Sequence, residues 1–139
     1  MAAPTPTVKA FLLADSVFQQ KNGKWCIVGV FDKLYATRFP VVHPSMGLYV
    51  KLADAKGSYR VRADIENSEG QQIARLDGIN VTAHDRAEEG GIGIEARGLL
   101  LPAPGTYFIK LYFNDAPPAG GIDIRFGVEQ VAATPPARS

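Results

Sequence analysis

A strict alternation of apolar and polar residues along Ser58–Glu66 is the feature that most constrains the fold of this chain. Apolar residues occupy every second position from Tyr59 to Ile65, and mostly charged residues lie between them. Successive side chains of a β-strand point to opposite faces of a sheet, so this pattern predicts a strand with one buried face. Thr106–Phe113 and Ile122–Glu129 repeat the pattern. No stretch long enough for a helix of about ten residues shows the corresponding apolar stripe.

Turn signals separate the predicted strands. Asn22-Gly23 is a strong hairpin signal because both residues accept positive φ. Pro102 and Pro117-Pro118 end strands, because proline has no N–H to donate to a neighbouring strand. The predicted strands are Val8–Val17, Trp25–Tyr35, Met46–Ala53, Ser58–Glu66, Gln71–Leu76, Ile79–Ala83, Ile92–Leu101, Thr106–Phe113 and Ile122–Glu129.

These strands predict an all-β fold. We expect a single antiparallel β-sandwich of about eight or nine strands with immunoglobulin-like character, and a barrel is the alternative. A length of 139 residues suits one domain. Both ends are rich in proline and small residues. We therefore expect a flexible N-terminal tail over residues 1–7, the sandwich domain over residues 8–131 and a flexible C-terminal tail over residues 132–139.

Composition argues against several classes of protein. Fifteen basic and fourteen acidic residues leave a net charge of +1, so we expect no binding of nucleic acid through bulk charge. No apolar run approaches the roughly 20 residues of a membrane-spanning helix, so we expect no membrane insertion. The single cysteine cannot form an intrachain disulfide, and the N-terminal residues lack the segment order of a secretory signal. These features predict a cytoplasmic protein.

Few residues suggest chemistry. Cys26 lies in the apolar run Trp25–Phe31, so we expect its thiol to be buried and inert. His84–Gly91 is charged and glycine-rich, and it predicts a mobile loop without a metal, because a metal needs three or four converging ligands. Gly90–Gly93 lacks the lysine and the following helix of a phosphate-binding loop. We expect no enzymatic activity, no catalytic residue and no cofactor.

Three predicted strands are apolar on both faces, whereas a sandwich strand should bury only one. In Trp25–Phe31 neither alternating set contains a charged residue. Either loops such as Ala36–Met46 cover these faces, or the faces form a contact with another protein. The candidate interface residues, chosen from strands in which the alternation fails, are Phe11, Leu13, Val28, Val30, Phe108 and Tyr112.

Several segments carry a resemblance to a known family. They are Val8–Asp15, Asn22–Lys24, Ile27–Phe31, Phe39-Pro40 and Pro104–Tyr107. Together they resemble the strands and turns of a bacterial family of uncharacterised all-β domains, over roughly residues 6–131. The resemblance implies a small immunoglobulin-like β-sandwich, a domain of unknown function with no catalytic residues to carry over.

Two functions remain open at this point. We expect a non-enzymatic protein–protein interaction or self-assembly module whose partner is another protein or a second copy of the chain. The alternative is a β-sandwich that binds a small ligand, or acts as a sensor, through the loops between its strands. A mass that rises with concentration would favour assembly, and a deep pocket with converging polar groups would favour a ligand.

Overall fold

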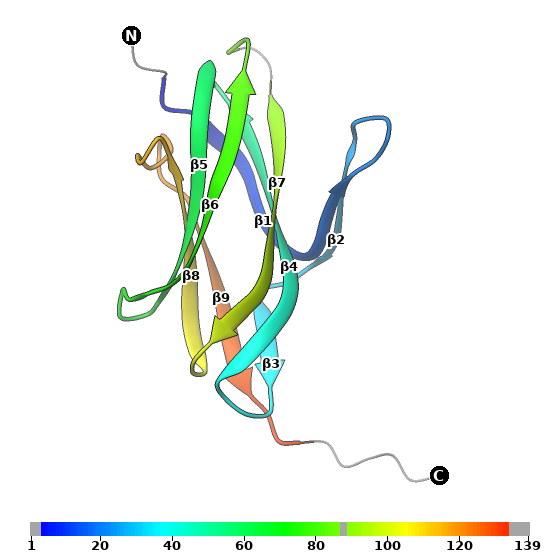
Figure 1. Cartoon of the computed structure of the whole chain (residues 1–139), viewed down its shortest axis with the longest axis vertical. Helices are drawn as coiled ribbons and strands as arrows, with labels where there is room; N and C mark the ends of the chain where they lie inside the picture. Colours follow the sequence, from blue (N-terminus) through cyan, green and yellow to red (C-terminus); the bar gives the residue numbers. More distant parts are fainter. Residues whose placement is uncertain (1–3, 87–88, 134–139) are drawn as a thin grey trace.

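The computed structural model describes residues 4–86 and 89–133, which form nine strands in two sheets (Figure 1). The first sheet has the order β2-β1-β4-β7 and is antiparallel. The second sheet has the order β3-β9-β8-β5-β6. The first sheet contains β1 (Thr7–Gln19), β2 (Trp25–Val30), β4 (Val41–Ala53) and β7 (Gly90–Leu101). The second contains β3 (Lys33–Ala36), β5 (Gly57–Asn67), β6 (Gln72–Ala83), β8 (Gly105–Phe113) and β9 (Asp123–Gln130).

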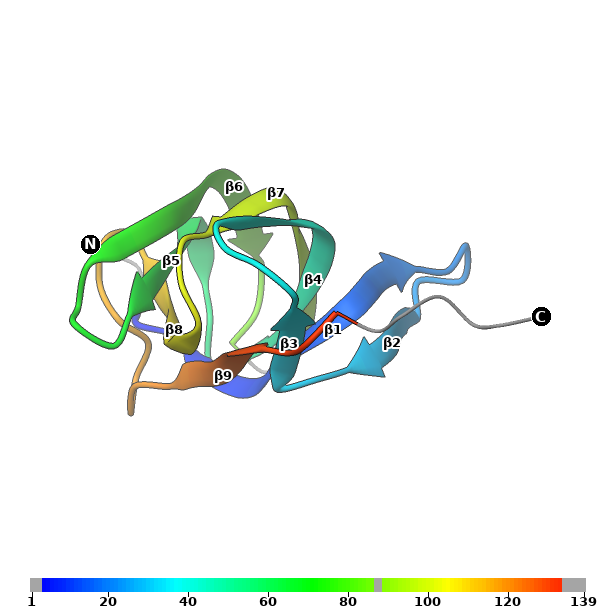
Figure 2. The same cartoon turned by 90° about the horizontal axis from the view of Figure 1, so that it is seen from below.

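The hydrophobic core lies between the two sheets, and the alternating strands supply most of it. The apolar set of β5, from Tyr59 to Ile65, is buried as the alternation predicts. Leu48 and Val50 of β4 enter the same core from the other sheet. Seen from below, the strands surround this core and β2 stands to one side (Figure 2). The all-β prediction is therefore confirmed.

The second sheet is mixed, so the prediction of a purely antiparallel fold is wrong. β3 pairs with β9 in parallel, from Lys33 opposite Gly127 to Ala36 opposite Gln130. The predicted strand Trp25–Tyr35 is in fact two strands, because the chain leaves the first sheet after Val30 and enters the second at Lys33. A short crossing between sheets leaves the local pattern of apolar residues unchanged, so the sequence does not reveal it.

Two further strands differ from their predicted bounds. Gln71–Leu76 and Ile79–Ala83 form one strand, β6, because Asp77-Gly78 makes an irregularity within the ladder rather than a turn. Gly78 has a φ of 79°, which glycine adopts without steric cost. β4 begins at Val41, five residues before the predicted start.

The N-terminal residues that the structure describes are held against the fold. The hydroxyl group of Tyr59 donates a hydrogen bond to the carbonyl of Pro4, at 2.6 Å. The N–H of Ala119 donates to the carbonyl of Pro6, at 2.9 Å. Residues 4–7, part of the expected N-terminal tail, therefore include groups that are hydrogen-bonded to the folded domain. Residues 1–3 and 134–139 of the expected tails lie outside the described residues.

Candidate functional site

β1 separates from its neighbour β4 in mid-strand. Residues 7–14 pair with β4, whereas residues 16–19 pair with β2 alone. The turn Gln20–Lys24, which the Asn22-Gly23 pair predicts, closes this two-stranded hairpin. We call residues 15–30 the arm. Figures 1 and 2 both show the arm extending away from the rest of the molecule.

Trp25 anchors the arm to the first sheet. A Cβ atom at Gly91 would lie 2.5 Å from Trp25 Nε1, and one at Gly93 would lie 2.7 Å from Trp25 Cζ3. The indole ring therefore lies directly against the backbone of β7, in space that only glycine leaves free. The same ring packs against Tyr49 of β4, with 5.7 Å between ring centroids.

Val17 makes a similar contact on the other strand of the arm. A Cβ atom at Gly47 of β4 would lie 2.8 Å from Val17 Cγ2. In the antiparallel ladder of the arm, Val17 is opposite Ile27 and Gln19 is opposite Trp25. Since directly opposed residues share a face, these four side chains lie on the side of the arm that faces the sheet.

The outward side of the arm is apolar and exposed. It carries the alternate cross-strand pairs, in which Phe18 is opposite Cys26 and Ser16 is opposite Val28. Phe18 is 49% exposed, Val28 is 53% exposed and Val30 is 60% exposed. Among the described residues, they are three of the large apolar side chains with a high exposed fraction. They form the candidate contact surface.

β2 is also an edge strand. It pairs with β1 on one side, and no described strand pairs with its other side. Its six residues include no charged side chain. Gly29 has a φ of 72° and its Cβ position is filled by the carboxyl group of Asp15, so β2 is irregular at this position, although its register with β1 continues to Val30.

Opposite charges flank this edge. Lys24 immediately precedes β2, and Asp32 follows it by two residues. Both are exposed, and neither makes an ion pair with another described residue. The edge is therefore uncharged in its middle, basic at its start and acidic beyond its end.

The structure separates the six predicted interface residues into three places. Phe11 and Leu13 belong to the hydrophobic core and cannot form an outer contact, so that part of the interface prediction is wrong. Their neighbour Leu12 is the residue of this stretch that faces outward. Val28 and Val30 lie together on the arm. A register shift between Val8 and Ala10 of β1 changes which side faces the core, and the sequence pattern alone does not show it.

Phe108 and Tyr112 lie on the outer face of the second sheet and are half-buried. The guanidinium group of Arg62 stacks over the ring of Tyr112, with its Cζ atom 4.3 Å from the ring centroid. Arg62 Nη1 also contacts the carboxylate of Asp115, at 2.6 Å. Side chains of the same sheet therefore cover part of this face, which is a different surface from the arm.

The most buried charge of the described residues lies in the same region. Asp64 is 5% exposed, and Arg75 Nε donates to its Oδ1 at 3.0 Å. This hydrogen bond raises the pKa of Arg75 above its ordinary value. Arg62 Nε lies 3.2 Å from the same carboxylate oxygen. These charges neutralise one another, so the cluster is a structural ion-pair network rather than a free anion-binding site.

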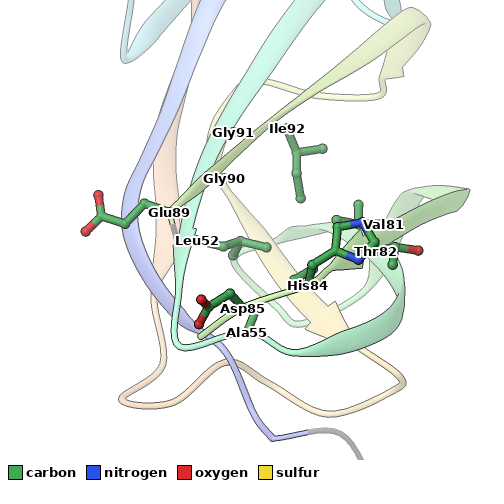
Figure 3. A pocket seen from close by; sticks show the side chains of 11 residues that line it. Leu52, Ala55, Val81, Thr82, His84, Asp85, Glu89, Gly90, Gly91 and Ile92 are labelled. Carbon is green, nitrogen blue, oxygen red and sulfur yellow. The ribbon is translucent and has the colours of Figure 1, made fainter. Parts of the chain in front are cut away.

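A small open pocket of about 180 Å³ lies where β6 ends and β7 begins (Figure 3). Leu52, Ile92 and His84 point toward its centre. The carboxylate of Glu89 instead binds Lys51 Nζ at 3.0 Å, which raises the pKa of Lys51. Ligand pockets usually have volumes of about 300–1,000 Å³ and several converging polar groups, so this pocket is poorly suited to a ligand.

The structure also bears on the predicted loop and on the cysteine. Residues 87–88 of the predicted loop lie outside the described residues, and β7 already begins at Gly90. Cys26 is half-buried rather than buried, because β2 is an edge strand and not a core strand. Its sulfur accepts a hydrogen bond from Gln20 Nε2 at 3.0 Å.

Within residues 4–86 and 89–133, no three His, Cys, Asp or Glu side chains gather closely enough to hold a metal ion. The same part of the chain contains no helix that is long and apolar enough to span a membrane.

Comparison with known proteins places the chain in a family. No curated protein matches its sequence. Among solved structures, the fold is similar to part of the Pseudomonas fluorescens alkylpurine DNA glycosylase AlkC bound to DNA containing an abasic site analog. The TM-score is 0.52 and the sequence identity is 12%, and the match covers 89% of this chain but 30% of the glycosylase. Residues 9–125 match the model of a family of unknown function, DUF6941, and the chain therefore belongs to that family.

Proposed function

We propose that this protein is a non-enzymatic protein-interaction module of the cytoplasm and that the arm, residues 15–30, is its contact surface. The observation that carries the proposal is a two-stranded hairpin with an exposed apolar side and an unpaired, uncharged edge strand.

The arm has little support from the rest of the fold. A hairpin of two strands is at best marginally stable in water unless one of its faces is packed. Trp25 and Val17 pack the inward face against glycines of β4 and β7. The outward face has no such cover, although burying a valine or phenylalanine side chain is worth about 1.5–3 kcal/mol. A partner that covers this face would gain that free energy.

Edge strands of this kind are usually protected. Proteins limit unwanted pairing at a sheet edge with lysine, proline or inward-pointing charges within the strand. β2 has none of these, and its one irregularity, at Gly29, lies near its end. An open, apolar edge is the surface to which a second β-strand adds most readily.

We propose with this that the two sheets form an immunoglobulin-like sandwich. Sheets of four and five strands around one core support that assignment. The likeness to the DNA glycosylase concerns the fold and carries no function to this chain. Arg60, Arg62 and Arg75 are each bound to a carboxylate, which argues against the second sheet as a phosphate-binding face.

The experiment compares two matched pairs of substitutions. The arm variant is Val28→Lys with Val30→Lys. The control is Val42→Lys with Leu100→Lys, a cross-strand pair of β4 and β7 that is 57% and 51% exposed. Both variants should keep the thermal stability of the wild type, because each replaces exposed side chains.

The measurement is quantitative capture of partners from a native extract by each immobilised variant. We expect the arm variant to lose the captured protein and the control variant to keep it. Equal capture by both variants would show that the arm is not the contact surface.

A further inference from the structure

We propose that the partner of the arm is a second copy of this chain, and that two β2 strands pair antiparallel around a two-fold axis. This inference rests on the proposed function, because it names the occupant of the same surface.

The charge pattern along the edge of β2 favours antiparallel pairing with a second copy. Lys24 stands at the start of β2 and Asp32 beyond its end, and neither has an ion-pair partner among the described residues. In an antiparallel pair of identical strands, the start of one strand approaches the end of the other. With Val28 of both copies at the two-fold axis, Lys24 of each copy lies toward Asp32 of the other, and two lysine–aspartate attractions form at once. In a parallel pair, lysine would approach lysine and aspartate would approach aspartate.

The open edge of β2 is also complementary to the same edge of a second copy. A two-fold interface brings the same patch of both copies together, so it requires a surface that is self-complementary. The segment Trp25–Val28 has no charge that could be repelled by its own copy. Alternate residues of β2 direct their N–H and C=O groups toward β1, and the others direct them toward the open edge. Antiparallel pairing would satisfy these outward groups on both copies.

Pairing through β2 would also extend the first sheet. Pairing of β2 with its copy joins two four-stranded sheets into one sheet of eight strands, in which β2 is no longer an edge. Val28 and Cys26 of one copy would then lie beside the same residues of the second copy. Phe18, which is opposite Cys26 on the adjacent strand β1, would lie next to them. One contact would then pair the open edge of β2 and also cover its exposed apolar side chains.

The test measures the monomer–dimer equilibrium by sedimentation, over a range of concentrations, for five proteins. These are the wild type, Lys24→Asp, the double variant Lys24→Asp with Asp32→Lys, Val28→Lys and the control Val42→Lys. We expect the wild type to form a dimer. Lys24→Asp should weaken the dimer by about threefold to tenfold, because acidic groups then meet at both ends of the paired strands.

The double variant decides the orientation and the identity of the partner. Exchanging both charges restores the opposition of unlike charges when a strand pairs with its own copy, so we expect the dimer to recover. Val28→Lys places like charges near the axis and should weaken the dimer by at least about tenfold. Val42→Lys is the matched control and should leave the equilibrium unchanged.

Two results would overturn this inference. A wild type that stays monomeric at its highest soluble concentration excludes the second copy. A dimer that the double variant fails to restore excludes the antiparallel pairing. If the wild type is monomeric but the arm variant still loses a captured protein, the proposed function stands and only the second copy is excluded.

Discussion

Gly91→Ala should detach the arm from the first sheet, because the new methyl group occupies the space of Trp25. A Cβ atom at residue 91 would lie 2.5 Å from Trp25 Nε1, 2.8 Å from Trp25 Cδ1 and 3.0 Å from the hydroxyl oxygen of Tyr49. Ordinary van der Waals contact begins at 3.4 Å. The indole ring therefore has to move by about 0.9 Å, the difference between 3.4 and 2.5 Å.

The expected cost follows from this overlap. An extra methyl group in a well-packed site destabilises a protein by about 1–3 kcal/mol when the neighbours stay in place. The intrinsic preference of a strand for alanine over glycine returns about 0.5–1 kcal/mol. Beyond residue 14, β1 pairs with β2 and with no other described strand. The arm can therefore relieve the remaining strain by moving away from the sheet.

The assay is the fluorescence of the only tryptophan in the chain, which is Trp25. We expect Gly91→Ala to shift its emission to longer wavelength and to increase quenching by acrylamide, because the ring loses its contact with β7. Gly90→Ala is the control, since a Cβ atom there meets nothing within 4 Å. If the two variants have the same emission, quenching and thermal stability, Trp25 does not pack on β7 and our account of the arm is incorrect.

Two further predictions concern the charged groups. Asp64→Asn should destabilise the fold by about 1.5–3 kcal/mol in urea unfolding, because the neutral amide no longer balances the charges of Arg62 and Arg75, whereas Asp115→Asn at an exposed position should cost less than about 1 kcal/mol. Glu89→Gln should lower the pKa of Lys51, measured by NMR titration, because the hydrogen bond that Lys51 donates to the Glu89 carboxylate is the main cause of its rise. A raised lysine pKa stabilises the folded state at neutral pH, and this contribution disappears as pH rises through the pKa of Lys51.

Local alternation predicted the strands that line the core. β5, β8 and β9 lie close to their predicted positions, because each pairs a buried side with a more polar one. The parallel pairing of β3 with β9 was not predictable, since it joins segments that are far apart in the chain. Pairing partners depend on the packing of the whole molecule, and one strand's pattern does not contain that information.

The packing of the arm has one signal in the sequence, which is the spacing of two glycines in β7. Gly91 and Gly93 occupy alternate positions of one strand, so they expose a strip of bare backbone on one face. Such a strip accepts a large ring, and the chain has one tryptophan, at position 25. The sequence prediction places Gly91 in a loop and Gly93 in a strand, whereas their spacing of two is typical of one face of a single strand.

The strands with two apolar faces have three different explanations in this structure. In β1, the apolar residues Phe11 and Leu13 belong to the core itself. In β8, Tyr112 lies under the guanidinium group of Arg62 on its own sheet. Neither explanation applies to β2.

No residue of the arm, 15–30, belongs to the hydrophobic core cluster or packs against it. The core therefore does not account for the apolar composition of β2, and no charged side chain of the described residues is seen to stack on its outward face. The exposed side chains Val28 and Val30 on its outward side therefore support the proposed contact with a partner. For this reason the arm, rather than the pocket or the arginine cluster, is the part of the molecule in which we place its function.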